Sequence, residues 1–107
     1  MRKFHHVGLP TDEKQPNETY VSDTKVFVTS PDDHPYKVEF LRYEPDSPVT
    51  GPLRELPHLA FSTDNLQAEI EGEEILLEPF HPMEGLTVAF ILKDGAVFEF
   101  MEGNATW

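Results

Sequence analysis

The residues best suited to chemistry in this chain lie in two matching segments. His6-Val-Gly-Leu-Pro-Thr-Asp12 recurs as His58-Leu-Ala-Phe-Ser-Thr-Asp64, so each copy opens on a histidine. Each copy is followed by a glutamate between apolar residues: Glu39 in Val-Glu-Phe and Glu99 in Phe-Glu-Phe. The chain therefore contains two His…Glu units. Two imidazoles and two carboxylates are a ligand set that suits Zn, Ni, Co, Mn or Fe.

Several properties of these residues favour a joint metal site over four unrelated polar positions. A carboxylate on an otherwise apolar strand is costly to bury unless it pairs with a charge or binds a metal. Taken singly, His6, Glu39, His58 and Glu99 are each compatible with an exposed strand position, and only their recurrence on matching strands favours the metal site. Four protein ligands with open positions would suit Lewis-acid catalysis. His5 should point to the face opposite His6 and remains an alternative ligand.

Strands are the elements that must position these side chains. Alternation of apolar and polar residues, bounded by turn residues, predicts strands over 4–9, 25–29, 36–43, 57–62, 75–78, 86–92 and 96–102. Pro79 should end the fifth strand. The last two should form a hairpin, with Gly95 supplying the positive φ of its turn. A segment rich in Pro and Gly, residues 44–52, links the halves.

The two halves differ in length, and the difference falls where a helix is expected. Glu39 follows His6 by 33 positions, whereas Glu99 follows His58 by 41. The second half has room for a short helix over 65–71, capped by Thr63 or Asp64. Residues 10–17 are polar and contain two prolines, so the helix of the first half should be reduced or absent.

Strand alternation also predicts what surrounds each histidine. His6 shares a face with Gly8, and His58 shares one with Ala60 and Ser62. We expect these small residues to leave room for a ligand beside each histidine.

Composition limits the class of protein. The chain has 107 residues, which is one domain, and a net charge of −12, which excludes nucleic acid and an anionic membrane surface as expected partners. It has no Cys, and no apolar run approaches the ~20 residues of a membrane span. We therefore expect a soluble, cytoplasmic protein. A domain this small buries a low fraction of its surface, so we expect a homodimer.

The motifs resemble the vicinal oxygen chelate superfamily, which includes glyoxalase I, methylmalonyl-CoA epimerase, extradiol dioxygenases and bleomycin-resistance proteins. The matching segments are His6-Val-Gly-Leu and residues 38–45, 57–66 and 93–102. The resemblance implies an α+β fold and a single glyoxalase-like domain over 1–107. In such a domain two βαβββ-type modules, residues 4–45 and 57–102, form a curved mixed sheet that encloses a cleft. Here the first-module helix should be reduced or absent.

The resemblance also implies roles for the four residues. His6, Glu39, His58 and Glu99 fall on the ligand positions of a divalent metal ion, in the pattern of glyoxalase I. Glu99 would double as the base that moves a proton on carbon next to a carbonyl, through a metal-bound enediolate. The implied function is that of a lyase or isomerase of the lactoylglutathione-lyase or methylmalonyl-CoA-epimerase type, acting on a small carbonyl or thioester substrate.

Two alternatives stay open. One is a metal-free small-molecule-binding protein on the same fold, akin to the drug-sequestering members of the superfamily. The other is a cupin-like metal-binding barrel, which the wide spacing of His6 and His58 fits poorly. No cluster of basic residues is evident for glutathione or coenzyme A. Arg42 and Arg54 are the only candidates, and Arg42 has the wrong strand parity for a pocket that contains Glu39.

Overall fold

The computed structural model describes residues 2–103, and the C-terminal residues 104–107, for which the sequence shows no pattern, lie outside that range. Eight strands form one mixed sheet in the order β2-β3-β4-β1-β5-β8-β7-β6. The strands are β1 (Lys3–Pro10), β2 (Thr19–Val21), β3 (Val26–Val28), β4 (Val38–Tyr43), β5 (His58–Ser62), β6 (Glu74–Met83), β7 (Leu86–Lys93) and β8 (Ala96–Gly103). The helical elements are short: a 3-10 turn η1 (Pro31–Asp33), α1 (Pro52–Glu55) and α2 (Leu66–Ile70).

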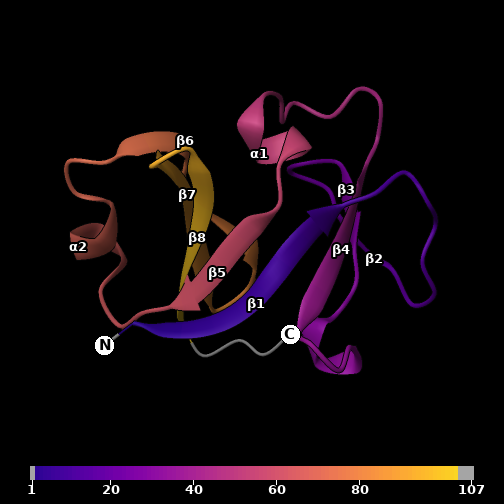
Figure 1. Ribbon diagram of the computed structural model, residues 1–107, viewed down its shortest axis with the longest axis horizontal. Helices are drawn as coiled ribbons and strands as arrows, with labels where there is room; N and C mark the ends of the chain where they lie inside the picture. Colours follow the sequence, from indigo (N-terminus) through magenta and orange to yellow (C-terminus); the bar gives the residue numbers. More distant parts are fainter. Residues whose placement is uncertain (1, 104–107) are drawn as a thin grey trace.

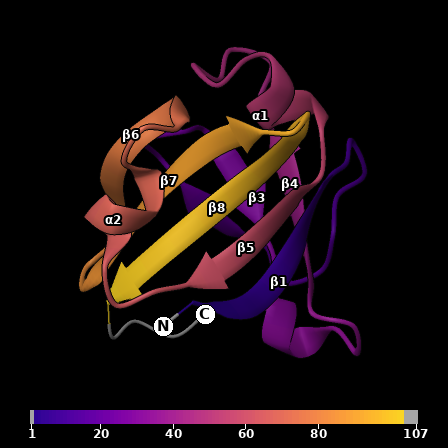
Figure 2. The same cartoon turned by 60° about the vertical axis from the view of Figure 1, so that its left-hand side comes forward.

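The sheet curls into a half-barrel built from two related halves. β1 and β5 run antiparallel at its centre, and each has a parallel partner from its own half, β4 for β1 and β8 for β5. From this centre the two wings, β2–β4 and β6–β8, recede on the same side (Figures 1 and 2). The predicted curved, mixed sheet of α+β type is therefore confirmed.

Strand alternation divides the sheet into an inner and an outer face. Inner-face side chains from both wings, among them Leu41, Val88, Phe90 and Val97, are buried in the concave side. Helix α2 covers the outer face of β7 and β8. Its buried residues, Leu66 and Ile70, pack in one cluster with Ala89, Ile91 and Phe100.

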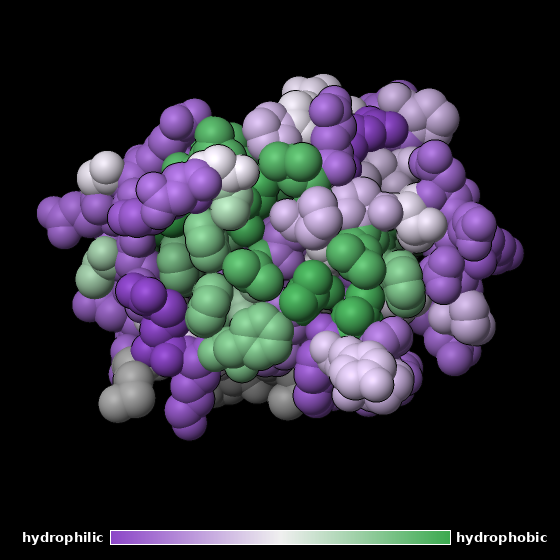
Figure 3. All heavy atoms as spheres, viewed as in Figure 1, coloured by the Kyte–Doolittle hydropathy of each residue, from purple (hydrophilic) through white to green (hydrophobic). Residues whose placement is uncertain are grey.

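The first half has no counterpart of α2 among the described residues. The chain between β1 and β2, residues 11–18, is irregular, as its polar, proline-containing sequence predicted. The outer face of the central strands therefore lacks a helical cover, and Phe4 and Leu59 are exposed on it. Figure 3 shows apolar side chains gathered over β1 and β5, with hydrophilic ones around them. Val38 and Phe40, the neighbours of Glu39, lie half-buried on this outer face.

The prediction that Pro79 ends a strand at residue 78 is wrong. β6 runs from Glu74 to Met83 and passes through both Pro79 and Pro82. It is the last strand of the sheet, so one edge needs no backbone donor, and prolines are tolerated there. The register of β6 against β7 shifts three times between Ile75 and Met83. These irregularities accommodate the two prolines.

Other differences are local. β2 (Thr19–Val21) was not predicted, because three residues carry too little periodicity. β4 begins at Val38 and not at residue 36, because Lys37 has a φ of 59°, outside the strand region. The linker is followed by α1, which begins at Pro52. α2 is capped by Asn65, whose side chain accepts from the Ala68 N–H, and not by Thr63 or Asp64.

No helix among residues 2–103 has the length and apolar character needed to cross a bilayer.

Candidate metal centre

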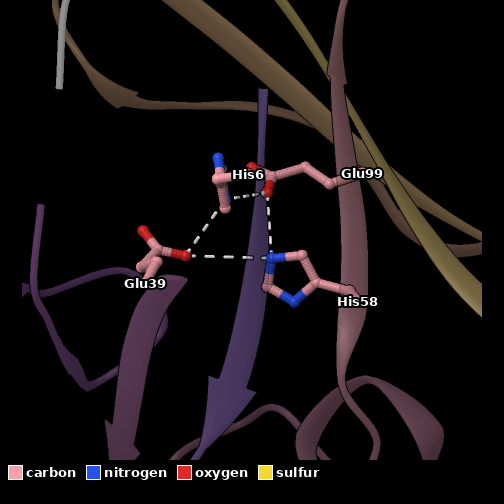
Figure 4. A group of neighbouring side chains, drawn as sticks. All are labelled: His6, Glu39, His58 and Glu99. Atoms are coloured by element: carbon pink, nitrogen blue, oxygen red, sulfur yellow. Dashed lines mark ion pairs between the residues drawn. The ribbon is translucent and has the colours of Figure 1, made fainter. Parts of the chain in front are cut away.

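The four predicted residues come together on the inner face of the four central strands. Glu39, His6, His58 and Glu99 lie on β4, β1, β5 and β8, which are neighbours in that order. Figure 4 shows their side chains pointing toward one another. Cross-strand register explains the arrangement, because small residues alternate with the functional ones. Gly8 is paired with both Glu39 and His58, and Ala60 is paired with both His6 and Glu99.

The distances between the four side chains suit a shared metal ion. One ligand atom from each residue lies within 4.8 Å of every other. His6 Nε2 is 3.3 Å from Glu39 Oε1 and 3.4 Å from Glu99 Oε1. His58 Nε2 is 3.1 Å from Glu99 Oε1 and 3.8 Å from Glu39 Oε1. Two ligands at 2.0–2.2 Å from a tetrahedral ion are separated by roughly 3.3–3.6 Å. The four contacts, at 3.1–3.8 Å, lie around that spacing.

Burial of these four side chains is energetically unfavourable unless their polar atoms have partners. Exposed fractions are 0% for His6, 2% for Glu39, 2% for His58 and 4% for Glu99. Within residues 2–103, His58 Nε2 and Glu99 Oε1 make no hydrogen bond, although they lie at ion-pair distance. A buried polar atom left without a hydrogen bond costs about 1–3 kcal/mol. A cation between these atoms would offset that cost, so the residues fit a divalent metal.

The small residue Gly8 is required for the position of His58. A Cβ at residue 8 would lie inside contact distance of the His58 ring. The ring is held on another side by Phe90, whose centroid is 5.2 Å away at an interplanar angle of 88°. The expectation that Gly8 leaves room for a ligand beside His6 is therefore wrong, because the His58 ring from the neighbouring strand occupies that room.

The charges of the cluster are strongly coupled. Burial is the largest influence on Glu39 and raises the pKa of its carboxyl. Burial acts in the same direction on Glu99, but contacts with His58 and His6 outweigh it and lower the pKa of that carboxyl to about 2. Burial also opposes protonation of His6, yet the two carboxylates raise its pKa to about 9. These contacts thus favour the protonated form of His6 and the ionised form of Glu99.

His5, the alternative ligand, does not join the four. Its Nδ1 lies 2.8 Å from Nδ1 of His6, so the two rings share one hydrogen bond. The register of β1 against β5 shifts between Phe4 and His6, a bulge that lets the His5 ring approach its neighbour instead of pointing away. Sequence reasoning missed this role, because a one-residue bulge leaves no signal in the alternation.

A cavity of about 50 Å³ lies beside the cluster, with Glu39 and Glu99 among its lining residues. Leu41 and Tyr43 also line it, in agreement with their strand parity. Met101, on the same face of β8 as Glu99, packs in the core. The cavity therefore places any small ligand against the two carboxylates.

The two candidate arginines do not line this cavity. Arg42 makes a bidentate ion pair with Glu18, at 2.7 and 2.9 Å, and stacks over the Phe27 ring. Arg54 donates to the backbone carbonyls of Glu44 and Val49. Their charges are thus directed elsewhere, as the parity of Arg42 predicted.

Comparison with known proteins shows the fold. No protein-family model matches the chain, and no curated protein sequence does. Among solved structures, the chain is similar to a hypothetical protein, BH1468, from Bacillus halodurans C-125. The TM-score is 0.71, with 18% sequence identity over 99% of this chain and 97% of that one. At this identity the likeness concerns the fold alone: a small, mostly β half-barrel that a solved structure shares along nearly its whole length.

Proposed function

We propose that this protein binds one divalent metal ion through His6, Glu39, His58 and Glu99, and acts as a lyase or isomerase on a small carbonyl compound. The convergence of four buried ligand atoms within 4.8 Å carries the proposal. Zn, Ni, Co, Mn and Fe all accept two imidazoles and two carboxylates. Metal analysis of the purified protein tests the proposal: one equivalent of a divalent metal is expected, and a protein that neither contains nor takes up such an ion would contradict it.

The architecture supports placing the chain with the vicinal oxygen chelate superfamily. The two His…Glu units coincide with the two structural halves, since His6 and Glu39 lie on the parallel pair β1–β4 and His58 and Glu99 on the parallel pair β5–β8. Each half thus contributes one imidazole and one carboxylate. This is the symmetry that the superfamily resemblance implies.

The chain's own residues supply what proton transfer needs. A bound divalent ion polarises a carbonyl oxygen as a Lewis acid. Glu39 and Glu99 both line the cavity, so a ligand held there would meet a carboxylate able to accept a proton from carbon. The superfamily resemblance assigns this role to Glu99. The apolar walls around it lower the local dielectric constant, which strengthens electrostatic interactions in the site.

Metal binding should release a proton from His6. The ion needs the deprotonated imidazole, whereas the pKa of His6 in the metal-free protein is raised to about 9. The apparent metal affinity is therefore expected to rise about tenfold per pH unit from pH 7 to 9 and then to level off. Calorimetric titrations in two buffers of different ionisation enthalpy count the protons released: at least one at pH 7.5, fewer above pH 9. An affinity that does not change between pH 7 and 9 would refute this linkage.

His5 should act by positioning His6. If His6 held the metal through Nε2, its Nδ1–H would donate to Nδ1 of His5. Such outer contacts typically contribute 10–100-fold to metal affinity. His5→Phe is expected to weaken metal binding by about that factor, while His5→Gln, whose amide oxygen can accept the same hydrogen bond, should weaken it less. Competition with a chromophoric chelator measures both. Equal losses in the two variants would contradict the hydrogen-bonding role.

The cavity also favours the alternative of metal-free ligand binding on the same fold. Its walls are mainly apolar, as in a pocket that sequesters small molecules. Thermal unfolding with a panel of metals and ligands separates the two functions, since only true ligands stabilise the folded state by mass action. Stabilisation by small molecules but by no metal would favour the alternative.

A further inference from the structure

We infer that the cavity beside the metal centre selects small, uncharged ligands and rejects anions, including carboxylates and phosphate-bearing conjugates. The inference deepens the proposed function and rests on it, because the ligand is placed against Glu39 and Glu99 of the same centre. It names the substrate class: a neutral carbonyl or hydroxycarbonyl compound of about five heavy atoms.

The described residues that line the cavity offer no positive charge to an anion. Besides Glu39 and Glu99, only Thr24 and Tyr43 contribute polar side-chain groups, and all other lining residues are apolar. No lysine or arginine of the described residues is among them. An anion that entered would lose its hydration without gaining a cation, which is strongly unfavourable in an apolar environment.

The basic residues are engaged elsewhere on the molecule. Of the eight Lys and Arg residues, five form ion pairs with carboxylates outside the cavity. These five are Arg2, Lys25, Lys37, Arg42 and Lys93. Arg54, near the ring of Tyr43, is already bonded to two backbone carbonyls. The net charge of −12 further lowers the local concentration of anions at any entrance.

The charge of the centre leads to the same conclusion. Two neutral imidazoles, two carboxylates and one divalent ion sum to zero, so the loaded site offers no excess positive charge to an anion. Without the ion, no lysine or arginine of the described lining replaces its charge. Selection against anions is thus expected in both states of the protein.

Cavity volume sets the size of the ligand. A water-sized group needs roughly 10–15 Å³ of such space, so about 50 Å³ admits roughly three to five groups of that size. Glutathione and coenzyme A conjugates carry carboxylates or phosphates, for which the described lining of this cavity offers no cation. The thioester substrates that the sequence suggested are therefore disfavoured relative to a free small carbonyl compound.

Two isosteric probes test the inference. Hydroxyacetone and glycolate have the same heavy-atom shape and differ by a methyl group in place of a charged oxygen. Saturation-transfer NMR and titration on the Zn²⁺-loaded and the metal-free protein should show hydroxyacetone binding, with glycolate weaker by at least about tenfold. Absence of hydroxyacetone binding, or glycolate binding equally well, would overturn the inference.

A rim substitution provides the matched control. Val21 lines the cavity and is half-buried at the end of β2, so a lysine there can place its ammonium group at the entrance. Val21→Lys should raise glycolate affinity, whereas Val21→Gln, similar in length but uncharged, should not. An equal gain in both variants would mean that size, and not charge, excludes the anion, and would overturn the inference.

The two proposals fail in different ways. Selective hydroxyacetone binding by a protein that takes up no metal would refute the metal-dependent function and leave the ligand class standing. A protein that binds stoichiometric metal but prefers glycolate would refute the ligand class and leave the metal-dependent function standing.

Discussion

In the Glu99→Gln variant, the affinity for a divalent metal ion falls by at least about 100-fold. Glutamine keeps the size of the side chain but removes the anionic oxygen that lies 3.1 Å from His58 Nε2 and 3.4 Å from His6 Nε2. Substitution of a residue that contacts a metal ligand, but not the metal itself, typically weakens metal binding 10–100-fold. Loss of a direct ligand should therefore reach at least the upper end of that range.

Thermal unfolding shows this loss as a change in metal-dependent stability. At a metal concentration 100 times the wild-type Kd, the ion stabilises the wild type by about 2.7 kcal/mol. A variant whose Kd is 100-fold weaker gains only about 0.4 kcal/mol at the same concentration. Glu78→Gln, at an exposed position of β6, is the matched control and should retain the full wild-type response. A Glu99→Gln protein with the same metal response as wild type would mean that Glu99 is not a ligand.

Gly8→Ala is expected to disrupt both the fold and the centre. The added Cβ would overlap the His58 ring, which is buried between residue 8 and Phe90 and has little space to retreat. Overpacking of this kind typically destabilises a domain by about 1–3 kcal/mol. The displaced imidazole would also no longer face Glu99, so metal binding should be lost together with stability. Chemical denaturation and the metal titration described above measure the two effects.

A double-mutant cycle separates steric overlap from any general effect of alanine in β1. In the His58→Ala background the ring is gone, so adding Gly8→Ala should cost much less than in the wild type. The backbone of residue 8 needs no positive φ, so a Cβ is not excluded by conformation alone. If Gly8→Ala is equally destabilising with and without the His58 ring, steric overlap with that ring is not the cause of the destabilisation.

Much of the candidate site could be predicted from local sequence, because strand geometry has a period of two. That period places His6 and Gly8, or Glu39 and Leu41, on one face without knowledge of any other strand. The polar, proline-containing loop after β1 likewise predicted the missing helix of the first half. Local reasoning was wrong at Pro79, because whether a strand tolerates proline depends on its being at the edge of the sheet, and sheet order is not a local property.

The sequence alone therefore determined the identity of the four candidate ligands and their division between two similar halves, and its family resemblance implied the curved mixed sheet. Only the tertiary structure decided that Gly8 makes room for the His58 ring, that a bulge brings His5 onto His6, and that the neighbouring cavity has no cation in its described walls. The physical reason is the range of the interactions involved. Side-chain alternation follows from the backbone of one strand, whereas cross-strand register and cavity lining depend on pairing between residues tens of positions apart.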